Sequence, residues 1–160
     1  TRFRNVTGVQ TCALPIFAFV AIDVEWFLSA APPATVKAQA SRRETIVRAI
    51  QEVHRAGKRA VVYTRNAKRH WREITGCDTE MSSKACGPLL RIVQDPRNPT
   101  PLWDVETGES TLEAFQPHGA WTERLGRQYR LDAPLFGLPP GRTLDLNVFD
   151  VSAFEPGRRG

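Results

Sequence analysis

Two carboxylic acids, Asp23 and Glu25, stand two positions apart at the end of the apolar run Phe17–Ile22. A continuous apolar run of this length predicts a buried strand of a parallel sheet, with the acids at its carboxyl end. Alternate residues of a strand point to the same side, so the two carboxyl groups would project together. Such a pair suits cleavage of a glycosidic bond, in which one carboxyl is protonated and the other ionised. The same spacing also fits a solvated strand end; Asp104–Glu106, which has no apolar run before it, is expected to be a loop pair.

The segments that follow the acid pair predict a β/α architecture. Ser41–Glu44 has the pattern of a capping box, with apolar residues at helical spacing behind it and Gly57 at the end. Arg59–Tyr63 predicts a second buried strand, and a short helix would extend from a cap at Asn66 to Gly76. This order of strands and helices favours a right-handed arrangement around a parallel sheet.

The second half of the chain has a different character, with frequent Pro and Gly and no convincing long helix. Its strand candidates are short: Pro101–Val105, Gly126–Tyr129 and Thr143–Phe149. Cys77 and Cys86 bracket a polar loop, and they could form a disulfide in an exported protein or remain two free thiols. No Cys and His spacing of the kind that binds zinc accompanies them. The basic run Arg65–Arg72 is expected on the solvated face of a helix.

Residues 1–16 are expected to be foreign to the domain. Val6–Ile16 matches, residue for residue, the in-frame translation of a common sequencing-library adapter, and it lacks the pattern of a signal peptide. Without Arg2 and Arg4 the net charge falls from +5 to +3, so the basic balance is a weak pointer to nucleic acid. The remainder is long enough for one domain with a core, and no apolar stretch reaches the ~20 residues of a membrane span.

Five short segments taken together carry a family resemblance over about residues 17–150. They are Ala21–Glu25, Val61–Thr64, Pro101–Trp103, Arg127–Tyr129 and Asp145–Phe149. Their order and approximate spacing resemble those of glycoside hydrolase family 25, and the last segment is the most telling. Members of this lysozyme family cleave peptidoglycan between N-acetylmuramic acid and N-acetylglucosamine, and the resemblance implies no cofactor or metal.

The resemblance implies a TIM-like barrel of eight strands and five helices, (β/α)5(β)3, of which this chain would carry the C-terminal five strands. Glu25 would be the general acid, Asp23 would stabilise developing charge or orient the N-acetyl group, and Asp145 would line the same site. The residues that bind substrate would be Tyr63, Trp103 and Tyr129. Aromatic faces suit the apolar faces of sugars. On the residues alone, the aromatics could equally belong to the core, and Asp145 could cap a turn.

The chain departs from that family because the first three β/α units have no counterpart in it. We therefore expect a truncated barrel over residues 17–152 and a basic tail over 153–160. An open half-barrel would expose a sheet edge, so we expect this chain alone to be inactive or poorly folded. Its parent would be a monomeric muramidase that acts on cell-wall peptidoglycan, outside the cell or at the wall, without a nucleic-acid or membrane partner.

Two other functions remain open on the sequence. An apolar strand that ends in Asp-x-Glu also occurs in 3′–5′ exonucleases of the DEDD type, whose carboxylates hold two metal ions. Asn147–Asp150 faintly resembles the second motif of those enzymes. A barrel that binds glycan without cleaving it could retain the same acids as binding groups.

Overall fold

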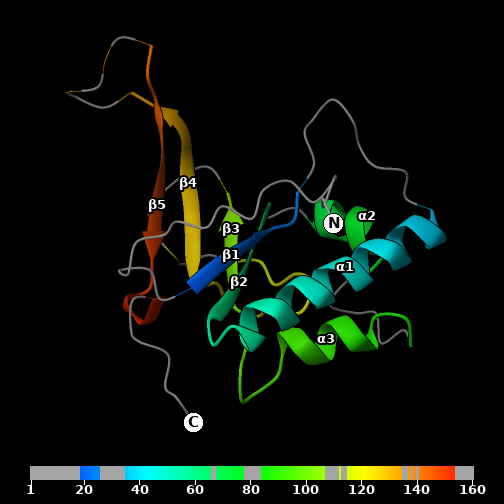
Figure 1. Cartoon of the computed structure of the whole chain (residues 1–160). Helices are drawn as coiled ribbons and strands as arrows, with labels where there is room; N and C mark the ends of the chain where they lie inside the picture. Colours follow the sequence, from blue (N-terminus) through cyan, green and yellow to red (C-terminus); the bar gives the residue numbers. More distant parts are fainter. Residues whose placement is uncertain are drawn as a thin grey trace.

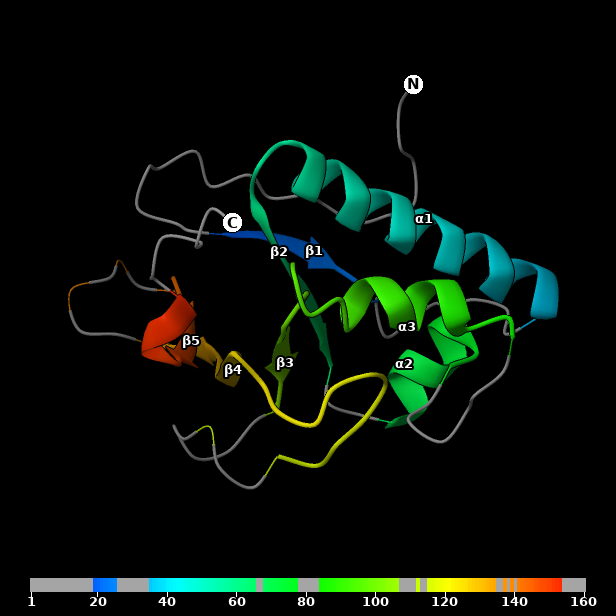
Figure 2. The same cartoon turned by 90° about the horizontal axis from the view of Figure 1, so that it is seen from below.

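The computed structural model shows a curled sheet and a group of helices that covers one of its faces (Figures 1 and 2). None of the helices in the part of the chain described below is long and apolar enough to cross a membrane. The adapter-like residues 1–16, the expected cap at Asn66 and the tail after Ala153 lie outside the described residues. The structure describes residues 19–25, 35–65, 68–77, 84–106, 112, 115–134, 137, 139 and 141–153.

Five strands form a single sheet in the order in which they occur in the chain, β1-β2-β3-β4-β5. They are β1 Phe19–Asp23, β2 Arg59–Arg65, β3 Leu102–Val105, β4 Gly126–Ala133 and β5 Leu144–Phe149. The first four are parallel, and β5 runs antiparallel to β4. The sheet curls into a half-barrel, so that the rings of Phe19 on β1 and Phe149 on β5 have centroids only 5.8 Å apart. The α/β class and the strand positions predicted from the sequence are confirmed.

Three α-helices pack on the outer, convex face of the sheet, and a short 3₁₀ helix, η1 Val151–Ala153, follows β5. The α-helices are α1 Val36–Arg55, α2 Lys68–Thr75 and α3 Gly87–Val93. The expected capping box at Ser41–Glu44 is wrong, because the hydroxyl of Thr35 caps α1 by accepting a hydrogen bond from the amide of Ala38 at 3.2 Å. Gly57 follows the helix in the left-handed conformation that its position requires, with φ +68°. The third helix was not predicted, because seven residues are too few to show a helical period.

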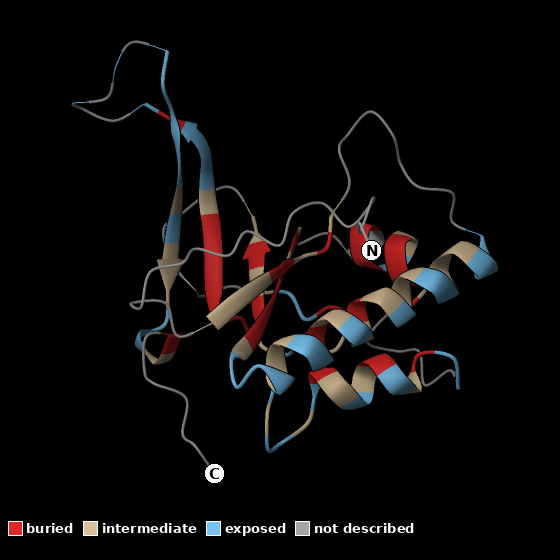
Figure 3. Ribbon diagram, viewed as in Figure 1, coloured by how far each residue is buried: buried red, intermediate tan, exposed pale blue. Residues whose placement is uncertain are grey.

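The main core lies between the helices and the outer face of the sheet (Figure 3). Ile22 and Val62 contribute from the first two strands, and Ile50 and Trp71 contribute from α1 and α2; all four are almost fully buried. Since neighbouring strand residues point to opposite faces, burial of Ile22 against the helices directs Asp23 to the inner face. The core therefore determines which side chains face the hollow of the half-barrel.

Cys77 and Cys86 form a disulfide that ties the end of α2 to the start of α3, with Cα atoms 5.9 Å apart. Both cysteines are buried. Of the two alternatives left open by the sequence, the structure contains the bridge.

Asp104 departs from the sequence expectation, because it lies in β3 and not in a loop. Its side chain is completely buried on the outer face and forms an ion pair with Arg124, whose Nη1 lies 3.1 Å from Oδ2 of Asp104. Arg124 also contacts Glu106 at 2.6 Å. Burial raises the pKa of Asp104 to about 6, while the charge of Arg124 opposes this rise. No apolar run precedes Asp104, but backbone pairing with β2 and β4 holds β3 in place on both sides.

Candidate functional site

Two rows of side chains cross the inner face of the sheet, opposite the three helices. The first row follows the strand register through Asp23, Tyr63, Trp103, Gly126 and Phe149. The second row lies two residues closer to the carboxyl ends of the parallel strands and consists of Glu25, Arg65, Val105, Gln128 and Asn147. Because side chains two residues apart share a face, the rows lie one above the other. The two carboxyl groups thus stand at the same end of both rows.

Asp23 is half-buried at the carboxyl end of β1. Its Oδ1 atom is buried and has no hydrogen-bond partner among the described residues. Burial, together with the charge of nearby Glu25, raises the pKa of Asp23 from 3.8 to about 7. Desolvation favours the neutral form of a carboxyl group, so Asp23 retains its proton at much higher pH than an ordinary aspartate. This is the property required of an acid catalyst.

Glu25 forms an ion pair with Arg65, whose Nε lies 3.1 Å from Oε2. The two side chains are 24% and 34% exposed, so the pair is only partly screened by water. Its geometry is held by β1–β2 pairing, in which the amide of Val24 donates to the carbonyl of Tyr63 at 2.8 Å. The expectation that Arg65 lies on a solvated helix face is wrong, since it is the last residue of β2 and its side chain points to Glu25.

Tyr63 links the two rows, because its hydroxyl donates a hydrogen bond to Oε1 of Gln128. Gln128 is only 3% exposed. Burial and the nearby carboxylates, Glu25 first among them, raise the pKa of Tyr63 above its usual value, so the phenol stays protonated. The single hydroxyl proton is therefore directed to the amide oxygen and away from Asp23.

Trp103 continues the inner face on β3. Its indole Nε1 donates to Oδ1 of Asn147 at 3.1 Å. Its ring stands nearly edge-on to Tyr63, with centroids 4.7 Å apart, and to Phe149 at 5.0 Å. These three rings form a continuous aromatic surface beside the carboxyl pair, where Tyr63 and Trp103 stay partly exposed.

Two of the predicted site residues lie apart from this group. Asp145 is exposed, and its Oδ1 accepts a hydrogen bond from the amide of Asp132 at 3.0 Å across the β4–β5 hairpin. It acts on the site through its charge, which contributes to the raised pKa of Tyr63. Tyr129 lies at a register shift that follows Gln128, and no hydrogen bond or ring contact among the described residues joins it to the aromatic surface.

Three side chains that complete the site were not predicted: Arg65, Gln128 and Asn147. The signal that could have found them is strand alternation, since Arg65 and Asn147 each lie two residues beyond a predicted site residue. Gln128 lies inside the segment Arg127–Tyr129 that carries the family resemblance, but the residue expected there to bind substrate was Tyr129.

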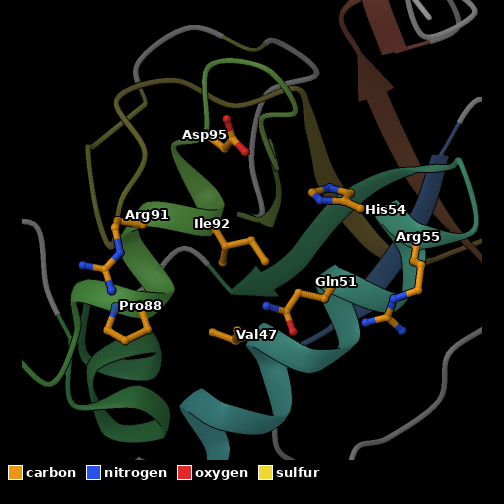
Figure 4. A pocket seen from close by; sticks show the side chains of 8 residues that line it. All are labelled: Val47, Gln51, His54, Arg55, Pro88, Arg91, Ile92 and Asp95. Carbon is orange, nitrogen blue, oxygen red and sulfur yellow. The ribbon is translucent and has the colours of Figure 1, made fainter. Parts of the chain in front are cut away.

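A second hollow, of about 640 Å³, lies between α1 and α3 (Figure 4). Its lining consists of Val47, Gln51, His54, Arg55, Pro88, Arg91, Ile92 and Asp95. Burial lowers the pKa of His54, and the charge of Asp95 partly offsets this. The main core separates this hollow from Asp23, and its lining includes one carboxyl group only. It therefore lacks the paired acids that distinguish the inner face.

The described residues contain no group of three His, Cys, Asp or Glu side chains placed to hold a metal ion. What the fold and the site define is an α/β half-barrel with a carboxyl pair and an aromatic surface on its inner face. No protein-family model, no curated protein and no solved structure matches the chain.

Proposed function

We propose that the parent of this chain is a peptidoglycan-cleaving glycoside hydrolase of the family 25 type, with Asp23 and Glu25 as its reacting carboxyls. The observation that carries the proposal is the position of this pair, at the carboxyl ends of parallel strands and beside an aromatic surface. Active sites of β/α barrels assemble at that end of the strands. Glycosidic cleavage requires two carboxyl groups in different protonation states.

The order of elements supports the same assignment. In the proposed correspondence, β1 to β5 are the fourth to eighth strands of the barrel. Helices follow β1 and β2, whereas the described residues between β3 and β4 and between β4 and β5 contain no helix. That change agrees with a barrel whose last three strands are joined by loops.

The inner face also offers what a sugar polymer requires. Tyr63 and Trp103 present partly exposed rings, suited to the apolar face of a pyranose. Asn147 and the Glu25–Arg65 pair supply polar groups in the row nearer the carboxyl ends of the parallel strands, suited to hydroxyl and N-acetyl groups. Asp145 adds a further exposed carboxylate near Tyr63.

Affinity for a transition-state mimic tests the proposal, since a half-barrel covers only part of a glycan and turnover by this chain alone is expected to be slow or absent. The chain is titrated by calorimetry with a chitooligosaccharide and with the corresponding δ-lactone, whose flattened ring resembles the oxocarbenium-like transition state. A hydrolase site should bind the lactone on the order of 100-fold more tightly. Glu25→Gln should reduce this preference, and Glu44→Gln, an exposed residue of α1, should not.

The other outcomes discriminate between the remaining functions. Equal affinity for both sugars, unchanged in Glu25→Gln, would assign the inner face to a glycan-binding barrel without catalysis. Absence of binding to either sugar would contradict the proposal. Magnesium-dependent degradation of single-stranded DNA would instead support the exonuclease alternative, to which the described residues lend no cluster of metal ligands.

A further inference from the structure

We propose that the hollow between α1 and α3 binds a dipeptide-sized zwitterion, whose carboxylate meets Arg91 and whose ammonium meets Asp95. The hollow lies on the helix-covered side of the sheet, and the main core separates it from the carboxyl pair. The proposal therefore goes beyond the proposed function and does not rest on it.

The walls of the hollow are single faces of two helices (Figure 4). On α1 the lining residues recur from Val47 to His54 at intervals of four and three residues, and on α3 Pro88, Arg91 and Ile92 recur in the same way. Such spacing places side chains on one face of a helix. Val47, Pro88 and Ile92 therefore offer an apolar wall to a side chain of the ligand.

The lining carries one available charge of each sign. Arg91 and Asp95 lie four residues apart, a spacing that favours ion pairs on a helix, yet neither forms an ion pair with a described residue. Arg55, the other cation of the lining, is paired with Glu52 on its own helix. Oδ1 of Asp95 accepts a hydrogen bond from the amide of Arg97 at 3.0 Å, while Oδ2 keeps its acceptor capacity. This balance fits a ligand with one carboxylate and one ammonium better than a simple anion.

The distance between the two charges indicates the length of the ligand. The side chain of Arg91 folds back toward the start of α3, because a Cβ atom at Gly87 would lie 3.6 Å from its Nη1. Asp95 lies just beyond the last turn, and a rise of about 1.5 Å per residue separates positions 87 and 95 by about 12 Å. Charged hydrogen bonds account for about 3 Å at each end, and the remaining ~6 Å matches an extended dipeptide. A single amino acid would be too short to reach both groups.

His54 provides a further contact near Asp95. Its Nε2 atom is buried and has no hydrogen-bond partner among the described residues. Buried polar atoms are normally paired, so this nitrogen indicates where a polar group of the ligand would lie. Burial lowers the pKa of His54 and the charge of Asp95 opposes this, so the ring is neutral near pH 7. A neutral imidazole nitrogen can accept a hydrogen bond from the ammonium that Asp95 attracts.

NMR titration of the full chain with the dipeptide alanyl-leucine tests the proposal. Its dissociation constant should be on the order of 1 mM, as expected for a ligand of this size. N-acetyl-alanyl-leucine lacks the ammonium and alanyl-leucine amide lacks the carboxylate, so each should bind about 10-fold more weakly. The imidazole signals of His54 should shift on binding, whereas those of His70 and His118, which do not line the hollow, should not.

Two variants assign the ends of the ligand. Arg91→Gln should weaken binding of alanyl-leucine about 10-fold and leave the affinity for the amide form unchanged. Asp95→Asn retains the oxygen that accepts from the amide of Arg97, and it should weaken alanyl-leucine but not the N-acetyl form. Arg48→Gln removes a cation of α1 that does not line the hollow, and it should leave all three affinities unchanged.

Equal affinity for the three peptides would overturn the proposal, as would an alanyl-leucine affinity that is unchanged in Arg91→Gln and in Asp95→Asn. Failure of the His54 signals to shift would also contradict it. Amide spectra verify that each variant is folded, and the blocked peptides test the same two charges on the unaltered chain if a variant unfolds. Because these readouts are independent of the lactone titration, either proposal can fail without the other.

Discussion

Asp23 should make the stability of the fold depend on pH. Its pKa is higher in the folded chain, about 7, than the ordinary 3.8 expected after unfolding. The protonated acid therefore contributes stability that is fully present below about pH 4 and is lost as pH rises through about 7. At pH 8 the fold must retain a half-buried charge.

Asp23→Asn should consequently stabilise the chain at pH 8, by about 1–2 kcal/mol after allowance for partial solvent exposure, and should stabilise it by less at pH 5. Urea unfolding of both proteins at the two pH values measures this difference. His70, whose pKa is lowered, has the opposite pH dependence, but it is present in both proteins and cancels. If the two proteins differ in free energy of unfolding by the same amount at pH 5 and pH 8, the pKa of Asp23 is not raised.

The Tyr63–Gln128 hydrogen bond offers a second prediction for single residues. Tyr63→Phe leaves the buried amide oxygen of Gln128 without its donor, which should lower the free energy of unfolding by about 1–3 kcal/mol. The double variant with Gln128→Leu should lose less than the two single variants together, because neither partner is then left unsatisfied. Urea unfolding of all four proteins completes the cycle, with Tyr129→Phe as the control. Strict additivity would show that the hydrogen bond is not formed in solution.

Among the secondary-structure elements, the β4–β5 pair depends on a glycine. A Cβ atom at Gly126 would overlap the ring of Phe149, its partner in the register. Gly126→Ala should therefore displace that ring and destabilise the fold by about 1–3 kcal/mol. At Gly87 in α3 the added Cβ would only reach ordinary contact, 3.6 Å from Nη1 of Arg91, so Gly87→Ala should be neutral or slightly stabilising. Thermal unfolding compares the two variants, and equal midpoints would contradict the packing.

The Cys77–Cys86 bridge fixes the connection from α2 to α3. A closed loop of this length should contribute about 2–3 kcal/mol by restricting the unfolded chain. The protein should therefore unfold at lower denaturant concentration after reduction, and Cys77→Ala/Cys86→Ala should behave like the reduced form. If a thiol reagent titrates all three cysteines of the unreduced chain in urea, and not Cys12 alone, this bridge is absent.

Strands were predictable from the sequence to a greater extent than the contacts between them. Apolar runs placed β1 and β2, and they placed Asp23 at a strand end, since burial requires apolar side chains wherever the sheet meets helices. The start of α1 was missed because Thr35 and Ser41 are both capable caps, and only the structure shows which hydroxyl meets a free amide. The local sequence lacked the information that decides between them.

The partners of the site residues could not be predicted for a different reason. The Tyr63–Gln128 contact spans 65 residues and the Trp103–Asn147 contact spans 44. Such contacts depend on strand order and register, which no local pattern specifies. The raised pKa of Asp23 has the same origin, because burial in the folded sheet is its largest cause, and the Asp-x-Glu spacing does not specify that burial.

On the scale of the whole molecule, the curl of the sheet determines how any ligand could approach. Phe19 and Phe149 meet across the inner face, and a small apolar cluster with Val61, Leu125 and Ala153 fills the amino end of the half-barrel. Arg59 adds a hydrogen bond of 2.8 Å to the carbonyl of Ser152 at the same end. Apolar side chains therefore pack at this end, whereas the carboxyl ends of the strands carry the polar row.

Because this apolar cluster occupies the amino end, a polymer could not pass through the half-barrel along its axis. A glycan strand would have to lie crosswise over the rim, with both of its ends free in solvent, so that any internal linkage could come to rest on Asp23 and Glu25. Under the proposed function, cleavage should therefore be endo-acting: chromatography of early digests should show glycan fragments of mixed length, and not a steady release of disaccharides from one end.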